Sequence, residues 1–190
     1  MSSSIKETLR KKIKEKRENL SQEEKKSLSF IIREKFLSLC EIEKAQIIMS
    51  YMDFKNEVET RKINETLFQK GKKVLVPRVS DDKEKIIPVE ITGEYKKGKF
   101  GIDEPIGKDY LNKDIDIVIV PGIVFNENCE RIGFGKGYYD KFISEIEKTE
   151  KKILKISLAY EFQIDNTFKK EEHDKSVDMI ITEKRIIKLL

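Results

Sequence analysis

The chain has 190 residues, enough for one domain with a buried core, and 39% of its residues are charged. One histidine and two distant cysteines argue against a zinc site and exclude a disulfide framework. The longest apolar run, Ile117 to Phe125, is too short to span a membrane, and no apolar signal core follows Met1. We therefore expect a cytoplasmic protein with no membrane partner.

The first element expected is an amphipathic helix over residues 4–19. Its apolar stripe consists of Ile5, Leu9, Ile13 and Leu20. A basic row beside that stripe consists of Lys6, Arg10, Lys14 and Arg17. A row at the edge of a buried seam can lean over a neighbouring cleft. Residues 1–36 hold 11 Lys or Arg against 6 Asp or Glu, so nucleic-acid binding is an alternative, although this helix has no interleaved aromatic residues.

A helical pair is expected over residues 1–40, because Ser21 and Glu24 form a capping box that begins a second helix. The core face of that helix is predicted to consist of Leu28, Ile31, Ile32, Phe36 and Leu39. An α/β body is expected over residues 45–184. Its strands are predicted over residues 47–52, 73–79, 86–91, 116–120, 154–159 and 179–182, with 116–120 in the centre of the sheet.

Helices are expected between these strands. One is capped by Asn56, with Ile63 and Leu67 facing inward, and another covers residues 136–147. Residues 96–111, which are rich in Gly and Lys, are expected to be irregular. The alternation predicts an α/β fold: a single three-layer domain whose central, largely parallel or mixed sheet has helices on both faces.

A glycine-rich turn follows the apolar strand over residues 117–120. Gly133, Gly135 and Gly137 permit positive φ angles and leave no Cβ between the backbone amides and a ligand. The next helix would direct its free N–H groups toward this turn. Arg131 and Lys136 add positive charge, and Asp140 adds a hard oxygen ligand of the kind that Mg²⁺ takes. These features indicate a site for a nucleotide polyphosphate, whereas the glycine spacing alone is typical of a structural turn.

The segment from Pro121 to Asp140 resembles the signature PGxxFDxxGxRLGxGxGYYD of the 5-formyltetrahydrofolate cyclo-ligases, also called methenyltetrahydrofolate synthetases. Asn126 stands where the family usually has Asp, and Cys129 stands where it usually has Gly. Other segments match the family in order, and they are Lys6 to Arg10, Glu57 to Thr60, Val76 to Val79, Gly101 to Pro105, Ala159 to Gln163, His173-Asp174 and Ile181 to Glu183.

This resemblance implies ATP-dependent closure of 5-formyltetrahydrofolate to 5,10-methenyltetrahydrofolate, with ADP and phosphate released and Mg²⁺ as cofactor. It implies that ATP is bound by Lys6, Arg10, Arg131, Gly133, Phe134, Gly135, Lys136, Gly137, Tyr138 and Tyr139. Lys136 and Tyr138 would be the catalytic residues, and Asp140 and Asp174 the metal ligands. The folate would be bound by Met52, Glu57 and Tyr138.

Structural interpretations stand beside these roles. Lys6 and Arg10 could form a solvated helix face, Glu57 could complement a helix dipole, and Asp174 could cap a turn. Cys129 is interpreted as a packing residue, with oxidation of a thiol in a glycine-rich loop as the alternative. Rival functions are a sugar-phosphate isomerase or acyl-transfer enzyme on a similar fold, a nucleic-acid-binding module, and a family member that no longer uses folate. We expect a monomer.

Overall fold

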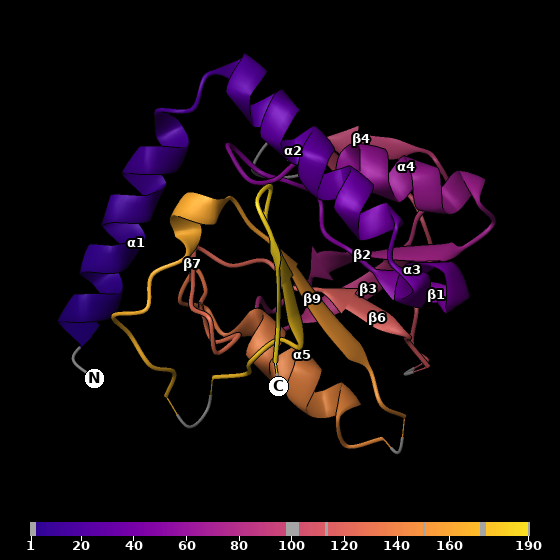
Figure 1. Ribbon diagram of the computed structural model, residues 1–190. Coiled ribbons are helices and arrows are strands. Elements are labelled where there is room, and N and C mark those ends of the chain that lie inside the picture. The colour runs from indigo at the N-terminus through magenta and orange to yellow at the C-terminus, as the bar shows by residue number, and fades with distance from the viewer. Residues whose placement is uncertain (1–2, 98–102, 113, 150, 172–173, 190) are drawn as a thin grey trace.

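The computed structural model describes residues 3–97, 103–112, 114–149, 151–171 and 174–189. Seven strands form one sheet in the order β11-β10-β9-β6-β1-β2-β3 (Figure 1). They are β1 (Ile47–Met49), β2 (Lys73–Val79), β3 (Ile86–Glu90), β6 (Ile117–Ile119), β9 (Leu154–Leu158), β10 (Met179–Ile181) and β11 (Ile186–Lys188). The five inner strands are parallel and the two edge strands, β3 and β11, are antiparallel to their neighbours. The predicted mixed sheet is confirmed, with β6 as its middle strand.

Helices cover both faces of the sheet. Alternate residues of β6 face opposite sides, so Ile119 packs with α2 (Gln22–Leu37), α3 (Cys40–Lys44) and α4 (Arg61–Gln69). Val118 packs on the other side with α5 (Tyr138–Ile146). Ile63 and Leu67 of α4 face inward, as predicted. The three-layer α/β fold is therefore confirmed, and none of the helices in the described ranges is both long and apolar enough to cross a membrane.

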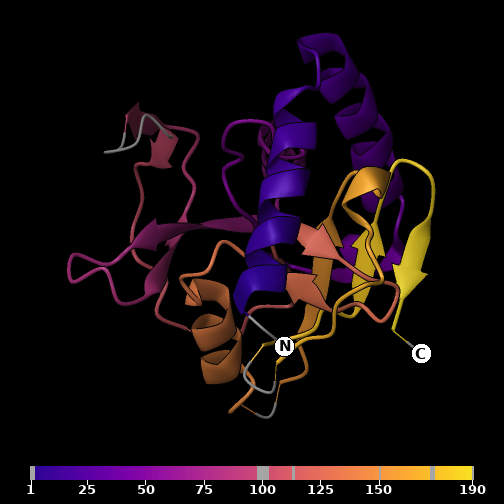
Figure 2. The same cartoon turned by 90° about the vertical axis from the view of Figure 1, so that its left-hand side faces the viewer.

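Helix α1 (Ser3–Glu18) packs beside the sheet, on a ribbon of β7 (Val124–Phe125) and β8 (Arg131–Ile132). Figure 2 shows α1 in indigo, alongside these short strands. Leu9 and Ile13 are buried there against an apolar cluster that consists of Ile123, Val124, Ile132 and Phe168. Ile5 is 43% exposed, so the buried stripe is shorter than predicted. This position brings the N-terminal turns of α1 to the glycine-rich turn.

Several elements differ from the predictions. Helix α4 begins at Arg61, because the Asn56 side chain donates instead to the Arg17 carbonyl (2.7 Å) and Thr60 is the N-cap residue. Helix α5 begins at Tyr138, since Gly137 is its N-cap in a left-handed conformation (φ 66°). Ile31, predicted to face the core, is 38% exposed.

The segment expected to be irregular contains a two-stranded sheet of β4 (Tyr95–Lys97) and β5 (Asp103–Pro105). Strands β7, β8 and β11 were also not predicted, because each has only two or three residues. A 3₁₀ turn, η1 (Glu161–Gln163), follows β9. Gly101, Ile102 and His173, which were among the matched segments, lie outside the described residues.

Candidate active site

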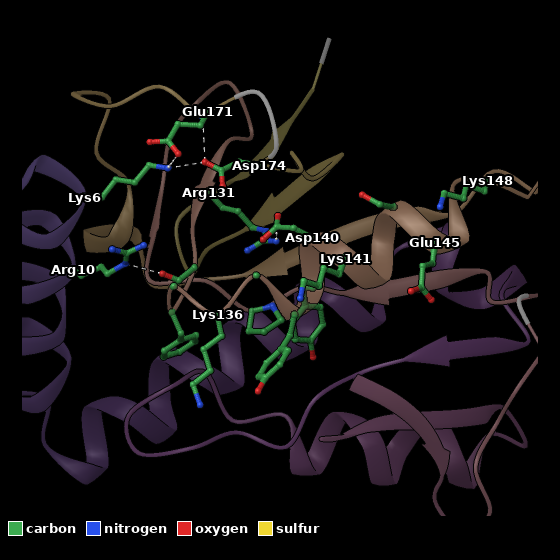
Figure 3. Close-up of a pocket in the computed structure, with 18 residues that line it drawn as sticks. Lys6, Arg10, Arg131, Lys136, Asp140, Lys141, Glu145, Lys148, Glu171 and Asp174 are labelled. Atoms are coloured by element: carbon green, nitrogen blue, oxygen red, sulfur yellow. Dashed lines mark hydrogen bonds and ion pairs between the residues drawn. The ribbon is translucent and has the colours of Figure 1, made fainter. Parts of the chain in front are cut away.

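A cavity of about 1130 Å³ opens between α1, the glycine-rich turn and α5 (Figure 3). Its wall includes every residue predicted to bind ATP or metal, namely Lys6, Arg10, Arg131, Gly133, Phe134, Gly135, Lys136, Gly137, Tyr138, Tyr139, Asp140 and Asp174. Pro121, two residues after the end of β6, also lines it, so the cavity lies near the carboxyl end of the central strand. The structure thus brings together residues from opposite ends of the sequence, while their roles stay predictions.

Six other residues line the cavity, and the sequence interpretation did not single out five of them: Lys141, Ser144, Glu145, Lys148 and Glu171. Lys141, Ser144 and Glu145 lie at three- and four-residue spacing on one face of α5, and Lys148 continues this spacing in the turn after the helix. That helical spacing is visible in the sequence, and it could have been used to place these residues beside the glycine-rich turn. Six cationic and four acidic side chains line the cavity, so it has a net positive charge suited to an anion.

The three glycines of the turn serve different purposes. Gly135 and Gly137 have φ angles of 96° and 66°, which L residues rarely adopt. Gly133 does not need such freedom, but a Cβ there would lie 2.9 Å from Nη1 of Arg131. Two glycines therefore shape the turn, and one leaves room for the arginine. The first N–H groups of α5, which follow the turn, lack partners within the helix.

The basic row of α1 leans over the cavity, as its position on the helix suggested. Nζ of Lys6 lies 2.8 Å from Oδ2 of Asp174 and 3.1 Å from Oε2 of Glu171. Burial lowers the pKa of Lys6, but its hydrogen bonds to these two carboxylates outweigh that effect and raise the pKa. Nε of Arg10 donates to the carbonyl of Gly133 (2.9 Å). Lys14 of the same row is exposed and does not reach the cavity.

A second ion pair lies deeper in the cavity, where Nη2 of Arg131 is 2.7 Å from Oδ1 of Asp140. The same oxygen accepts a hydrogen bond from the backbone N–H of Lys175 (3.0 Å). The Arg131 side chain is only 4% exposed, and its Nε has no partner among the described residues. Figure 3 shows the Lys136 side chain pointing away from both ion pairs. The two predicted metal ligands are thus each held by a cation.

The chemistry of these carboxylates fits Mg²⁺ in one particular way. Among the described residues, no three His, Cys, Asp or Glu side chains are grouped so that they could hold a metal ion. Mg²⁺ is usually bound by one or two carboxylates together with substrate phosphates and water. Asp140 and Asp174 line one cavity together with Lys and Arg side chains that could bind phosphate groups. The two carboxylates therefore suit a metal ion that arrives with its nucleotide.

Of the three residues predicted for folate, Tyr138 lines this cavity, whereas Met52 and Glu57 are not among its lining residues. Met52 packs against the apolar cluster beneath α2 and α4. Glu57 is buried, and one of its oxygens accepts a hydrogen bond from the N–H of Phe54 (2.9 Å). Burial raises the pKa of Glu57, while Arg17 opposes this rise. The charges of Glu57 and Arg131 act in opposite directions on the pKa of Tyr139, which burial raises most of all.

Tyr138 and Tyr139 face different surroundings. The Tyr138 hydroxyl donates to the carbonyl of Lys83 (2.9 Å), and its ring centroid lies 5.8 Å from Nζ of Lys136. Burial raises the pKa of Tyr139, so its hydroxyl stays protonated. Tyr139 also packs against the apolar cluster that α5 shares with the sheet, as expected from its helix face.

The two departures from the family signature have structural explanations. Oδ1 of Asn126 accepts hydrogen bonds from the N–H groups of Asn128 (3.1 Å) and Glu130 (3.0 Å), as an aspartate oxygen would. Cys129 has a φ of 57°, a conformation that favours the glycine usual there. Its thiol is buried, and burial raises its pKa to about 11. Burial and a raised pKa both favour the packing interpretation of Cys129 over that of a reactive thiol.

The fold and the cavity define an α/β enzyme with a cationic cavity, suited to a polyanion, beside its central parallel strands. The model of the 5-formyltetrahydrofolate cyclo-ligase family matches residues 2–183, and the chain belongs to this family, which is a family of ligases.

Curated relatives and solved structures agree with this assignment. The chain is 27% identical to a mouse 5-formyltetrahydrofolate cyclo-ligase, covering 95% of this chain and 94% of the relative. A solved structure of 5,10-methenyltetrahydrofolate synthetase from Aquifex aeolicus has a TM-score of 0.84 at 34% identity and covers 97% of this chain and 93% of its own. The synthetase from Mycoplasma pneumoniae has a TM-score of 0.77 at 29% identity, with coverages of 94% and 98%.

Proposed function

We propose that this chain uses ATP and Mg²⁺ to close 5-formyltetrahydrofolate to 5,10-methenyltetrahydrofolate, releasing ADP and phosphate. One observation carries the ATP and Mg²⁺ part of this proposal. The cations, glycines and carboxylates that the family signature assigns to these ligands line a single cavity, although they come from α1, the turn, α5 and the segment before β10. Family membership supports the folate part.

The chemical difficulty is that an N-formyl group is an amide, which is a poor electrophile with a poor leaving oxygen. Transfer of the γ-phosphoryl group of ATP to the formyl oxygen releases ADP and makes the formyl carbon electrophilic. N10 then attacks this carbon, the carbon–oxygen bond breaks, phosphate leaves and N10 loses its proton. The protein mainly has to position two reactants and neutralise phosphate charge.

The ion pairs of the cavity suit this task because they can exchange partners. Lys6 and Arg131 now neutralise Asp174 and Asp140. With a nucleotide bound, the two cations, together with Arg10, would donate to phosphate oxygens. The two carboxylates would then be available to Mg²⁺, which supplies neutralisation of phosphate charge. Lys136, on the exposed part of the turn, is the proposed partner of the transferred phosphoryl group.

Folate binding is assigned to the neighbouring segment. The Glu57 carboxylate can accept two parallel hydrogen bonds from adjacent N–H donors of a pterin edge. Met52 would provide an apolar wall, and the half-buried ring of Tyr138 a stacking face between the two substrates.

The rival functions make different demands. A nucleic-acid-binding helix needs its basic row exposed, but Lys6 and Arg17 are buried and hydrogen-bonded within the protein. A sugar-phosphate isomerase or acyl-transfer enzyme would not depend on ATP. ATP dependence therefore separates the proposed reaction from the enzyme alternatives.

The test is an absorbance assay for methenyltetrahydrofolate, with protein, 5-formyltetrahydrofolate, ATP and Mg²⁺, and with ATP or Mg²⁺ omitted in turn. We expect product only in the complete mixture. Asp140→Asn should lower kcat by about 100-fold, because it removes a carboxylate that would hold Mg²⁺, the ion that neutralises phosphate charge. Asp81→Asn, a matched change at an exposed turn, should have no effect. Product formation without ATP, or no product from folded protein, would contradict the proposal.

A further inference from the structure

The last turn of α1 is joined to the segment that carries Glu57. Nε of Arg17 donates to the carbonyl of Asn56 (3.1 Å), and Nδ2 of Asn56 donates to the carbonyl of Arg17 (2.7 Å). Nη2 of Arg17 lies 3.9 Å from Oε1 of Glu57, and both side chains are less than 10% exposed. A reciprocal pair of hydrogen bonds thus sets the position of the guanidinium beside the carboxylate.

Several elements contribute to the electrostatic surroundings of Glu57. Burial raises the pKa of Glu57, and Asp53 raises it further. Arg17 is the largest opposing influence, followed by the Phe54 N–H group and Lys25 of α2. The charge of Glu57 in turn contributes to the raised pKa values of Tyr51 and Tyr139, whose hydroxyls stay neutral.

Lys25 cannot replace the arginine. Its Nζ donates to the Lys55 carbonyl (2.8 Å) and is shared with Asp53 (3.7 Å) and Glu59 (3.9 Å). Arg17 is therefore the cation that acts most directly on Glu57.

The protonation state of Glu57 decides what it can bind. An ionised carboxylate accepts on both oxygens, whereas the neutral acid carries an O–H donor on one of them. A pterin edge with two adjacent N–H donors needs the ionised form. A buried carboxylate without a nearby cation tends to take up a proton.

We propose that Arg17 is a positioning residue for the folate substrate, which holds Glu57 as a carboxylate and in the orientation that accepts the two pterin N–H groups. This inference rests on the proposed role of Glu57. Arg17 lies on the same helix as Lys6 and Arg10, which line the nucleotide cavity. Helix α1 therefore serves both substrate sites, with its first turns at the phosphates and its last turn at the pterin anchor.

The test is the pH dependence of kcat/KM for 5-formyltetrahydrofolate at saturating ATP. Folate binding needs ionised Glu57, so activity falls as the pH drops through its pKa. Arg17→Gln removes the positive charge that opposes the raised pKa of Glu57. The acid limb of the profile, where kcat/KM falls at low pH, should therefore move to higher pH. We expect the KM for folate to rise about tenfold at neutral pH, the equivalent of about 1.4 kcal/mol, while the KM for ATP is little changed.

Three other variants separate charge from position. Arg17→Lys keeps the charge and should retain most of the wild-type acid limb. Asn56→Ala removes one hydrogen bond to Arg17 but no charge, and should raise the KM for folate without moving the limb. Lys14→Gln removes a charge from the exposed face of the same helix and should change neither.

An unmoved acid limb in Arg17→Gln, with both KM values raised alike and a lower Tm, would overturn the inference and leave Arg17 as a structural contact. If Arg17→Gln does not fold, Arg17→Lys provides the test. An acid limb of its kcat/KM profile that differs from that of the wild type, although the charge is kept, would also overturn the inference. Wild-type protein that forms no methenyl product would instead contradict the proposed function itself.

Discussion

The Tyr139 hydroxyl is buried at the wall of the cavity and has no hydrogen-bond partner among the described residues. A buried polar group without a partner costs stability, unless a ligand satisfies it. Burial raises the pKa of Tyr139, so the hydroxyl is a donor at neutral pH. Arg131, whose Nε also lacks a described partner, contributes to the same wall. These two donors suit an oxygen-rich ligand in the cavity.

Tyr139→Phe should therefore separate stability from activity. We expect an unchanged free energy of unfolding, or one raised by about 1 kcal/mol, because an unsatisfied hydroxyl is removed. The kcat/KM should fall by about 10-fold, the equivalent of one hydrogen bond to substrate. Denaturant unfolding and the methenyl assay measure the two quantities. Tyr110→Phe is the control and should leave kcat/KM unchanged, because Tyr110 does not line the cavity and its hydroxyl already has Asp114 as a partner. Equal activity of Tyr139→Phe and wild type would show that no substrate uses this hydroxyl.

Helix α1 is held in place by a short apolar seam, and we expect the geometry of both proposed substrate sites to depend on that seam. Ile13 is 1% exposed between α1 and the β7–β8 ribbon. Ile13→Ala should lower the free energy of unfolding by about 2–5 kcal/mol, because a cavity remains. The KM values for ATP and folate should both rise, since Lys6 and Arg17 lie on either side of this residue along the helix. Unfolding curves and kinetics at a temperature where the variant is folded measure these effects.

Ile5→Ala is the matched control, because Ile5 is 43% exposed on the same helix. It should change the free energy of unfolding by less than about 0.5 kcal/mol. If Ile13→Ala lost stability but kept both KM values, α1 would be a covering helix without influence on the sites.

The elements that sequence patterns predicted well are those decided by local chemistry. The capping box of Ser21 and Glu24 begins α2, and the boundaries of β2 agree with the prediction. The predicted start of α4 was wrong. Asn56 is a favourable N-cap residue, but its side chain donates a hydrogen bond to the Arg17 carbonyl of a helix distant in sequence. No local pattern contains that contact. The short strands β7, β8 and β11 have too few residues for alternation to be visible.

For the whole molecule, strand–helix alternation predicted the layers but not the direction of every strand. Strands β2 and β3 are joined by a turn and so pair antiparallel, as do β10 and β11 at the opposite edge. The residues predicted to bind the nucleotide came from the resemblance to the family, and the fold brings them together because α1 packs on the β7–β8 ribbon. The partners of Glu57 were missed because Arg17, Lys25 and Tyr139 come from three helices.

The proposed exchange of ion-pair partners would affect the stability of the whole chain. A ligand that binds only the folded state stabilises it by about 2.7 kcal/mol at 100 times its Kd. For a domain of this size, that corresponds to a rise in Tm of about 5–10 °C. We expect ATP with Mg²⁺ to give such a rise in a thermal unfolding experiment.

The same experiment tests the assignment of the phosphate and metal ligands. EDTA should remove most of the rise, because without the cation the phosphates meet the charges of Asp140 and Asp174. Lys6→Ala should also reduce it, since the variant loses a phosphate donor. Adenosine, which carries no phosphate, should give almost no shift. An equal shift with adenosine, or one unaffected by EDTA and by Lys6→Ala, would mean that binding does not depend on the ion pairs of this cavity.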